Sequence, residues 1–220
     1  MPCTLSNSPF SVKASSGLGE SYRMRAQYYF QNEKAMAINA TVFKVFLQVA
    51  DMDRHYYADH TLTLARHPSE TDERMMVRLL AFALYADEAL AFGKGLSSDD
   101  EPDLWQKDLT GAIERWISVG LPDERFIRKA CGRAAKVVVI SYGSPADIWW
   151  KENRGKLQQQ DKLTVLKLSA ESTQALAELA SRTMQLQCTI QEGHVLVTCD
   201  AGVVEIEPEV LHGDFRAEHA

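Results

Sequence analysis

The chain has 220 residues, 45% of them hydrophobic, and a formal net charge of −6. This length is sufficient to bury a core of one ordinary domain, and no apolar run approaches the ~18 residues of a membrane span. The beginning of the chain also lacks the charged-then-apolar pattern of a secretory signal, so we expect a cytoplasmic protein with no membrane partner. The acidic balance argues against broad affinity for nucleic acid, which would have to be contacted locally or through a metal.

Residues 1–35 are rich in serine, show no apolar periodicity, and carry four basic and two acidic side chains. We interpret them as an extension outside the fold. Two explanations remain open: a flexible or targeting extension, or upstream sequence ahead of a true start at Met36. The remainder, residues 36–220, is expected to form a single domain.

Residues 40–50 and 56–65 have the alternating, strand-rich composition of a β-hairpin. Residues 70–92 follow as an amphipathic helix with Ser69 as its N-cap. Helical spacing places Glu73 on the apolar, core-facing stripe of this helix. Because a core-facing acid needs a partner, either a cation or an arginine is expected beside it, unless Glu73 is simply a first-turn acid that stabilises the helix dipole.

A second hairpin is predicted from residues 102–105 and 113–119, which are rich in β-branched and aromatic residues. A turn centred between residues 108 and 109 places Asp103 directly opposite Glu114. A register two residues further on pairs Asp103 with Trp116 and still leaves both carboxylates on one face. Like charges this close destabilise a sheet unless a cation lies between them. A hydrated Mg²⁺ ion fits such a pair, and a solvated surface hairpin is the alternative.

Residues 122–131 read as a helix whose side chains Arg125, Arg128 and Lys129 share one face, with Arg133 and Lys136 beyond it. This is the densest basic patch of an acidic chain. It is either a solvated helix face or a set of phosphate contacts.

The apolar run 137–142 is typical of a central strand covered on both faces. The elements expected after it are a helix through residues 149–150, a strand at 162–168, a helix within 169–183, a closing hairpin at 184–191 and 194–200, and a frayed tail from residue 208. The expected fold is therefore of the mixed α/β class: a central mixed sheet flanked by helices, with β-hairpins near both ends.

Four strings, MDRHYY, HPSETDERMMVRLLAFAL, EPDLWQKDLTG and IRKACGRA, occur in this order. From about Met36 to its end the chain closely resembles the YaeQ family of small bacterial proteins. The resemblance implies a restriction-endonuclease-like core of the PD-(D/E)xK type, in which a helix glutamate, a Pro-Asp and an acid-x-lysine surround Mg²⁺. Glu73, Pro102 with Asp103, and Glu114 match in order.

The departure from that pattern is Trp116, which stands where the lysine is expected. Related nucleases sometimes place this lysine on the following helix, so the resemblance implies Lys129 as the replacement, with Arg128 as the less favoured choice. The family is also linked by name to transcription elongation, which implies a transcription-related protein partner.

Two hypotheses follow. In the first, the protein is a phosphodiesterase or nuclease in which Asp103, Glu114 and Glu73 hold Mg²⁺ or Mn²⁺ and Lys129 stabilises the developing phosphate charge. Asp103→Asn should then relieve repulsion between unpaired acids in metal-free buffer. In the second, the protein is a catalytically inactive nuclease-fold protein. It binds nucleic acid, or a transcription-related partner, through its basic helix with Arg125, Arg128 and Arg133.

Overall fold

The computed structural model describes residues 40–93 and 101–215. The expectations for residues 1–35 lie outside this part of the chain. The described helices are α2 (Asp72–Leu84), α3 (Glu124–Arg133), α4 (Ala146–Leu157) and α5 (Ala170–Glu178). The described strands are β1 (Thr41–Asp51), β2 (Tyr56–Arg66), β3 (Leu90–Phe92), β4 (Leu104–Lys107), β5 (Ile113–Val119), β6 (Ala134–Tyr142), β7 (Leu163–Leu168), β8 (Thr183–Gln191), β9 (His194–Cys199), β10 (Gly202–Ile206) and β11 (Glu209–His212).

These strands form two mixed sheets: the expected central sheet, which contains residues 137–142 and is flanked by helices, and a second sheet that was not expected. The five-stranded sheet has the order β10-β9-β8-β1-β2, and the six-stranded sheet has the order β11-β7-β6-β5-β4-β3. The two expected hairpins, β1-β2 and β8-β9, are present, and they become one sheet because β1 and β8 pair in parallel. Alternation within each hairpin predicts its buried face but carries no signal for which strand its edge will join.

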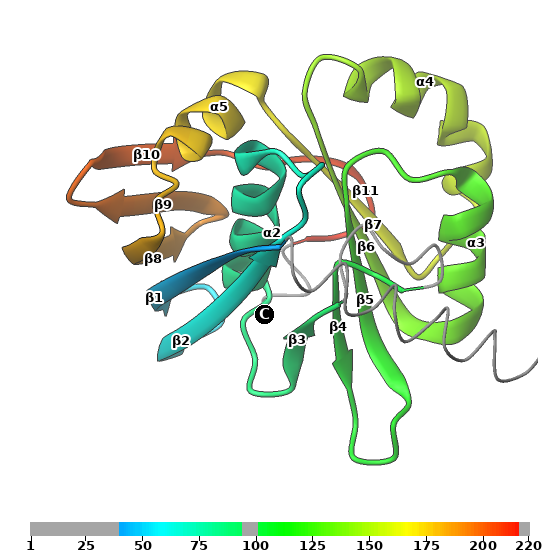
Figure 1. Ribbon diagram of the computed structural model, residues 1–220. Helices are drawn as coiled ribbons and strands as arrows, with labels where there is room; N and C mark the ends of the chain where they lie inside the picture. Colours follow the sequence, from blue (N-terminus) through cyan, green and yellow to red (C-terminus); the bar gives the residue numbers. More distant parts are fainter. Residues whose placement is uncertain (1–39, 94–100, 216–220) are drawn as a thin grey trace, which may run out of the picture. The chain divides into compact units, whose positions relative to one another are not determined.

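Helix α2 lies between the two sheets (Figure 1). One apolar core contains its side chains together with inward-facing residues of both sheets and of α5. A second core lies on the other face of the six-stranded sheet, where Ile127 of α3 and Leu157 of α4 pack against Val137 and Val139 of β6. The six-stranded sheet is therefore covered on both faces, as expected for the run at residues 137–142. The five-stranded sheet buries one face only, as the alternation of buried and exposed residues along β1 and β8 shows.

Helix α2 begins and ends at other residues than expected. Its N-cap is Thr71, whose side chain accepts a hydrogen bond from the Arg74 backbone N–H, rather than Ser69. The helix ends at Leu84, and residues Leu90–Phe92 instead pair with β4. Strand pairing thus overrides a helical pattern that continues in the sequence.

The expected frayed tail is also incorrect over residues Glu209–His212, which form β11 and pair with β7. This strand completes the edge of the six-stranded sheet. Its four residues, EVLH, are too few to show an alternation that would reveal the strand.

Candidate functional site

Asp103 lies directly before β4, beside the end of β5 and the first turn of α2, and both of its carboxylate oxygens accept a hydrogen bond. Oδ1 accepts a hydrogen bond from Arg74 Nη2 at 2.6 Å, and Oδ2 accepts one from the Val119 backbone N–H at 2.7 Å. The residue is only 7% exposed. A buried carboxylate with a guanidinium and an amide as partners is stabilised as an anion without a metal.

Arg74 belongs to a chain of ion pairs along α2. Its Nη1 donates to Glu70 Oε1 at 2.9 Å, and Arg78 Nη2 donates to Glu70 Oε2 at 3.1 Å. Glu70 and Arg78 are both buried. Burial by itself lowers the pKa of Arg74, but the charges of Asp103 and Glu70 outweigh this effect and the pKa is raised. Arg74 is therefore the permanent cation between two carboxylates.

Glu73 projects from the same turn of α2 toward α5, where Thr173 Oγ1 donates to its Oε1 at 2.6 Å. Glu73 and Asp103 both act on the half-buried hydroxyl of Tyr142 at the end of β6. Burial is the main cause that raises the pKa of Tyr142 to about 12; Arg74 opposes the rise, while Glu73, Asp103 and Glu70 add to it. We call Glu70, Glu73, Arg74, Asp103 and Tyr142 the ionic cluster. Two of the predicted catalytic acids, Glu73 and Asp103, belong to it.

Glu114 does not. The observed register pairs Leu104 with Ile117, so Asp103 lies beside the end of β5 near Ser118 and neither predicted register is correct. Glu114 is exposed and stands four residues before Ser118, which corresponds to about 13 Å along a strand. The β4-β5 register also shifts between Gln106 and Lys107, so that Glu114 has no partner across the ladder. A long-range register and a bulge have therefore separated two acids that sequence parity placed together.

Lys129 is also wrongly placed by the sequence. It is an exposed residue of α3, and α3 packs on the face of the six-stranded sheet opposite α2, against Trp116. Arg128 lies on the same helix and is likewise exposed. Neither can reach Asp103 through the sheet. The cation beside Asp103 is Arg74, from the helix that precedes it.

The side chains around Asp103 do not fit a hydrated Mg²⁺ ion. Such an ion is held by one or two carboxylates with oxygens available to it, whereas both oxygens of Asp103 accept hydrogen bonds from Arg74 and Val119, and one oxygen of Glu73 accepts a hydrogen bond from Thr173. Across residues 40–93 and 101–215, no three His, Cys, Asp or Glu side chains are grouped so that they could hold a metal ion.

The predicted nucleic-acid contacts Arg125, Arg128 and Arg133 are all exposed on α3. Arg133 also stacks its guanidinium on Trp116, with 5.3 Å between Cζ and the ring centroid. Helix α4 lies beside α3 and adds the exposed Lys151, Arg154 and Lys156 (Figure 1). We call this surface of α3 and α4 the basic face.

The region that carries the basic face is positively charged, although the chain as a whole is negatively charged. Residues 122–162 contain nine basic and five acidic residues, a net charge of +4, so the rest of the chain carries −10 to give the total of −6. Glu124 forms long ion pairs with two of these cations, at 3.7 Å from Arg128 and 3.6 Å from Lys156. The side chains of both cations are more than 60% exposed, so the pairs contribute little to stability and leave the cations accessible to a ligand.

Sequence reasoning missed Arg74, Glu70 and Tyr142. Glu70, Arg74 and Arg78 are spaced four residues apart, which places them on one side of a helix and was a usable signal for the ion pairs. Tyr142 carried no such signal, because its position follows from the order of strands in the sheet.

The fold and its two charged regions define a class: a mixed α/β protein with a helix between two sheets, an internal ionic cluster and a basic outer helix pair. The comparisons identify the family. The family model described as "YaeQ protein" matches residues 36–208, and the chain belongs to the YaeQ family.

Relatives match over most of their length. The uncharacterized protein YaeQ of Escherichia coli (strain K12) is 48% identical over 172 residues, 78% of this chain and 95% of that protein. Its counterpart in Salmonella typhi is 47% identical over 173 residues, 78% of this chain and 96% of that protein.

Two solved structures are similar in fold. The crystal structure of YaeQ from Xanthomonas axonopodis pv. citri has 51% identity and a TM-score of 0.78, covering 80% of this chain and 99% of that one. The structure of YaeQ from Pseudomonas syringae has 36% identity and a TM-score of 0.77, covering 80% and 98%. In the described part of this chain, no helix is both long enough and apolar enough to cross a membrane.

Proposed function

We propose that this protein binds nucleic acid through the basic face of α3 and α4 and does not cut it. The observation that supports this most is the +4 charge of residues 122–162 in a chain of net charge −6. Contacts to phosphate groups require only a local basic surface, and the protein as a whole need not be basic. The binding would be of modest affinity and strongly dependent on salt.

The residues of the basic face are suited to backbone contacts. Arg125 and Arg128 are three residues apart on α3 and point to one side of it, and Arg154 of α4 extends the positive surface. Guanidinium groups make bidentate contacts to phosphate oxygens. The half-buried Trp150 of α4 adds a ring on which an unpaired base can stack. A protein partner related to transcription is the other expectation. The basic face favours nucleic acid over it, because phosphates supply regularly spaced negative charge.

The absence of cutting follows from the position of the charges. The ionic cluster and the basic face lie on opposite faces of the six-stranded sheet, so a strand bound to the basic face does not reach Asp103. In addition, Arg74 and Val119 occupy the carboxylate oxygens that a hydrolytic metal would need. A restriction-endonuclease-like ancestry is compatible with this proposal and accounts for Glu73 and Asp103 standing close together.

The test is binding of short fluorescent single-stranded and duplex oligonucleotides, followed by anisotropy. We expect the double variant Arg125→Glu, Arg128→Glu to weaken binding at least about tenfold at low salt. Lys44→Glu, which reverses a charge on an exposed residue of β1 in the other sheet, is the control and should change little. Equal effects of the two variants would refute the basic face as the site.

The same oligonucleotides, incubated with Mg²⁺ or Mn²⁺, test the non-catalytic part of the proposal. We expect no cleavage. Cleavage by the wild type that is lost in Asp103→Asn would contradict the proposal and establish the nuclease hypothesis instead.

A further inference from the structure

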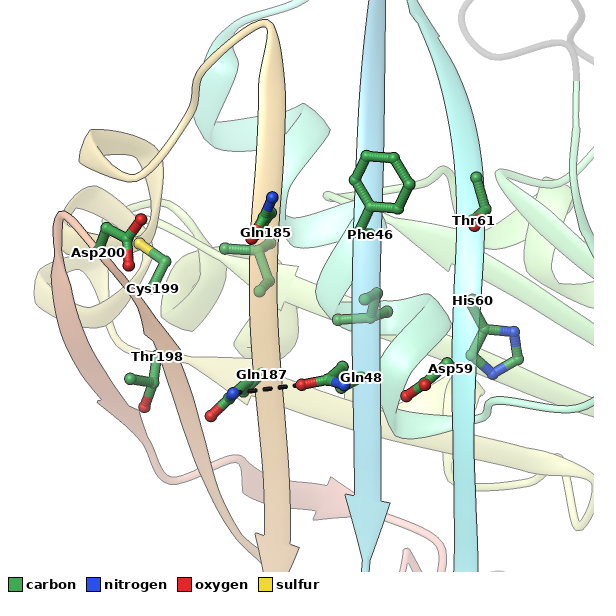
Figure 2. A pocket seen from close by; sticks show the side chains of 12 residues that line it. Phe46, Gln48, Asp59, His60, Thr61, Gln185, Gln187, Thr198, Cys199 and Asp200 are labelled. Carbon is green, nitrogen blue, oxygen red and sulfur yellow. Dashed lines mark hydrogen bonds between the residues drawn. The ribbon is translucent and has the colours of Figure 1, made fainter.

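The outer face of the five-stranded sheet carries a groove of about 700 Å³ (Figure 2). This volume lies in the range of small-molecule sites. The groove crosses β2, β1, β8 and the end of β9. It lies on the face of the sheet turned away from α2 and is separate from both the ionic cluster and the basic face.

The sheet register arranges the groove floor in two neighbouring rows. In the first row, Thr61 pairs with Phe46 and Phe46 with Gln185. In the second row the pairs run from Asp59 to Gln48, from Gln48 to Gln187, and from Gln187 to Thr198. Within the second row, Gln187 Nε2 donates to Gln48 Oε1 at 3.2 Å, which fixes both carboxamides across the groove (Figure 2). Each carboxamide oxygen has two lone pairs, so acceptor capacity remains for a ligand.

Carboxylates lie at both ends of the groove. Asp59 is exposed on β2, and Asp200 is exposed just after β9, on the opposite side (Figure 2). Three spacings between neighbouring strands, roughly 14 Å at about 4.8 Å each, separate them across the sheet, and Asp200 lies two residues beyond Thr198, which is in the row of Asp59. Among the described residues, no lysine or arginine lines the groove. Burial lowers the pKa of the neighbouring His60, against the opposing charge of Asp59, and so favours the neutral imidazole.

Between the two acids the groove presents an aromatic ring. Phe46 stands on β1, which lies between β2 and β8, and it is 45% exposed although it is a large apolar residue. A ring exposed in this way offers apolar contact to methylene groups and attracts a cation to its face. The groove therefore combines negative charge at two separated ends with an apolar and amide-bearing middle.

We propose that this groove binds a linear aliphatic polyamine. The terminal ammonium groups pair with Asp59 and Asp200, the methylene segments lie over Phe46, and an inner ammonium donates to the carboxamide oxygen of Gln48 or Gln187. The charge complementarity and the separation of the two acids select this ligand. A neutral sugar would leave both carboxylates without a counter-charge. A peptide would find no free backbone groups on the face of a sheet, since strands offer these only at their edges.

The experiment is calorimetric titration of the full chain, free of nucleic acid, with spermidine at fixed ionic strength. We expect one site, with binding weakened about fivefold by Asp59→Asn and again by Asp200→Asn, as for exposed charge pairs. Both aspartates are exposed, so the variants should fold normally. The diamine putrescine is too short to reach both ends and should bind more weakly than spermidine.

The matched control is Glu152→Gln, which removes one negative charge from an exposed position on α4. Spermidine binding should be unchanged in it. An equal loss of affinity in Glu152→Gln would mean general attraction of polycations to an acidic protein and would overturn the proposal. The proposal would also be overturned if the wild type did not bind spermidine. This includes the case in which a lysine-rich peptide, rather than spermidine, binds in the groove. Because nucleic acid is absent, none of these outcomes depends on the function of the basic face.

Discussion

The sequence predicts that the buried acid Asp103 is a metal ligand, whereas in the structure it forms an ion pair with Arg74. The expectation that Asp103→Asn relieves repulsion between carboxylates assumed that these acids are unpaired, which is not the case for Asp103. We now expect Asp103→Asn to lower the free energy of unfolding by about 2–4 kcal/mol, because it leaves the buried guanidinium of Arg74 without one of its anions. Denaturation by urea in EDTA measures this change.

The control for that variant is Asp147→Asn. Asp147 forms an ion pair with Lys167 at 2.6 Å, but its side chain is 70% exposed. The loss of such a surface pair should cost less than about 1 kcal/mol. If Asp103→Asn were as stable as the wild type, the ion pair with Arg74 would not contribute as described.

The raised pKa of Tyr142 predicts how the free energy of unfolding changes at alkaline pH. Burial raises its pKa in the folded protein from 10.0 to about 12. The unfolded chain therefore loses this proton first, so the stabilisation is complete below about pH 10 and falls as the pH rises toward 12. Tyr142→Phe should reduce the decline of stability over this window, and it should remove a late-titrating step from the tyrosinate absorbance. Identical titration curves in the two proteins would refute the assignment to Tyr142.

At the scale of elements, the backbone around Pro102 and Asp103 is held by a close approach of Gly93. Its backbone N–H donates to the Asp103 carbonyl oxygen at 2.8 Å, and a Cβ at this position would lie 2.0 Å from the Pro102 oxygen. Gly93→Ala should therefore destabilise the protein by about 2 kcal/mol or more, as overpacking against backbone does.

Gly155 provides the control for Gly93→Ala. It lies inside α4 with nothing within 4 Å of a built Cβ. Gly155→Ala should raise the free energy of unfolding by up to about 1 kcal/mol. Thermal unfolding of the two variants side by side distinguishes close packing at Gly93 from a general response to alanine.

For β4 and β5, the sequence predicted the strands but not their register. Strands β4 and β5 were predictable because β-branched and aromatic residues mark them, and parity placed Asp103 on a definite face. Their register was not, since it depends on β5 pairing with β6 on its other side and on a shift at Gln106. Glu114 was assigned to the site for that reason. Arg74 was within reach of sequence reasoning, since its spacing from Glu70 is that of an ion pair on a helix.

For the whole molecule, each hairpin was predictable alone, whereas their union into one sheet was not. The parallel pairing of β1 with β8 joins residues 44–51 to residues 183–190, and nothing local encodes a contact over that separation. The division of charge between two faces of the six-stranded sheet has the same origin. Helices α2 and α3 were both expected to flank the central sheet, but only the structure shows that they cover opposite faces.

The most direct test of the central claim is the salt dependence of oligonucleotide binding. Each phosphate contact releases counterions and contributes roughly −0.7 to −0.9 to the slope of log K against log salt. For the wild type we predict a clearly negative slope, and for Arg128→Glu a slope less negative by about one contact, while Lys44→Glu keeps the wild-type slope. A wild-type affinity that does not change with salt, or a slope that Arg128→Glu leaves unchanged, would contradict nucleic-acid binding by the basic face.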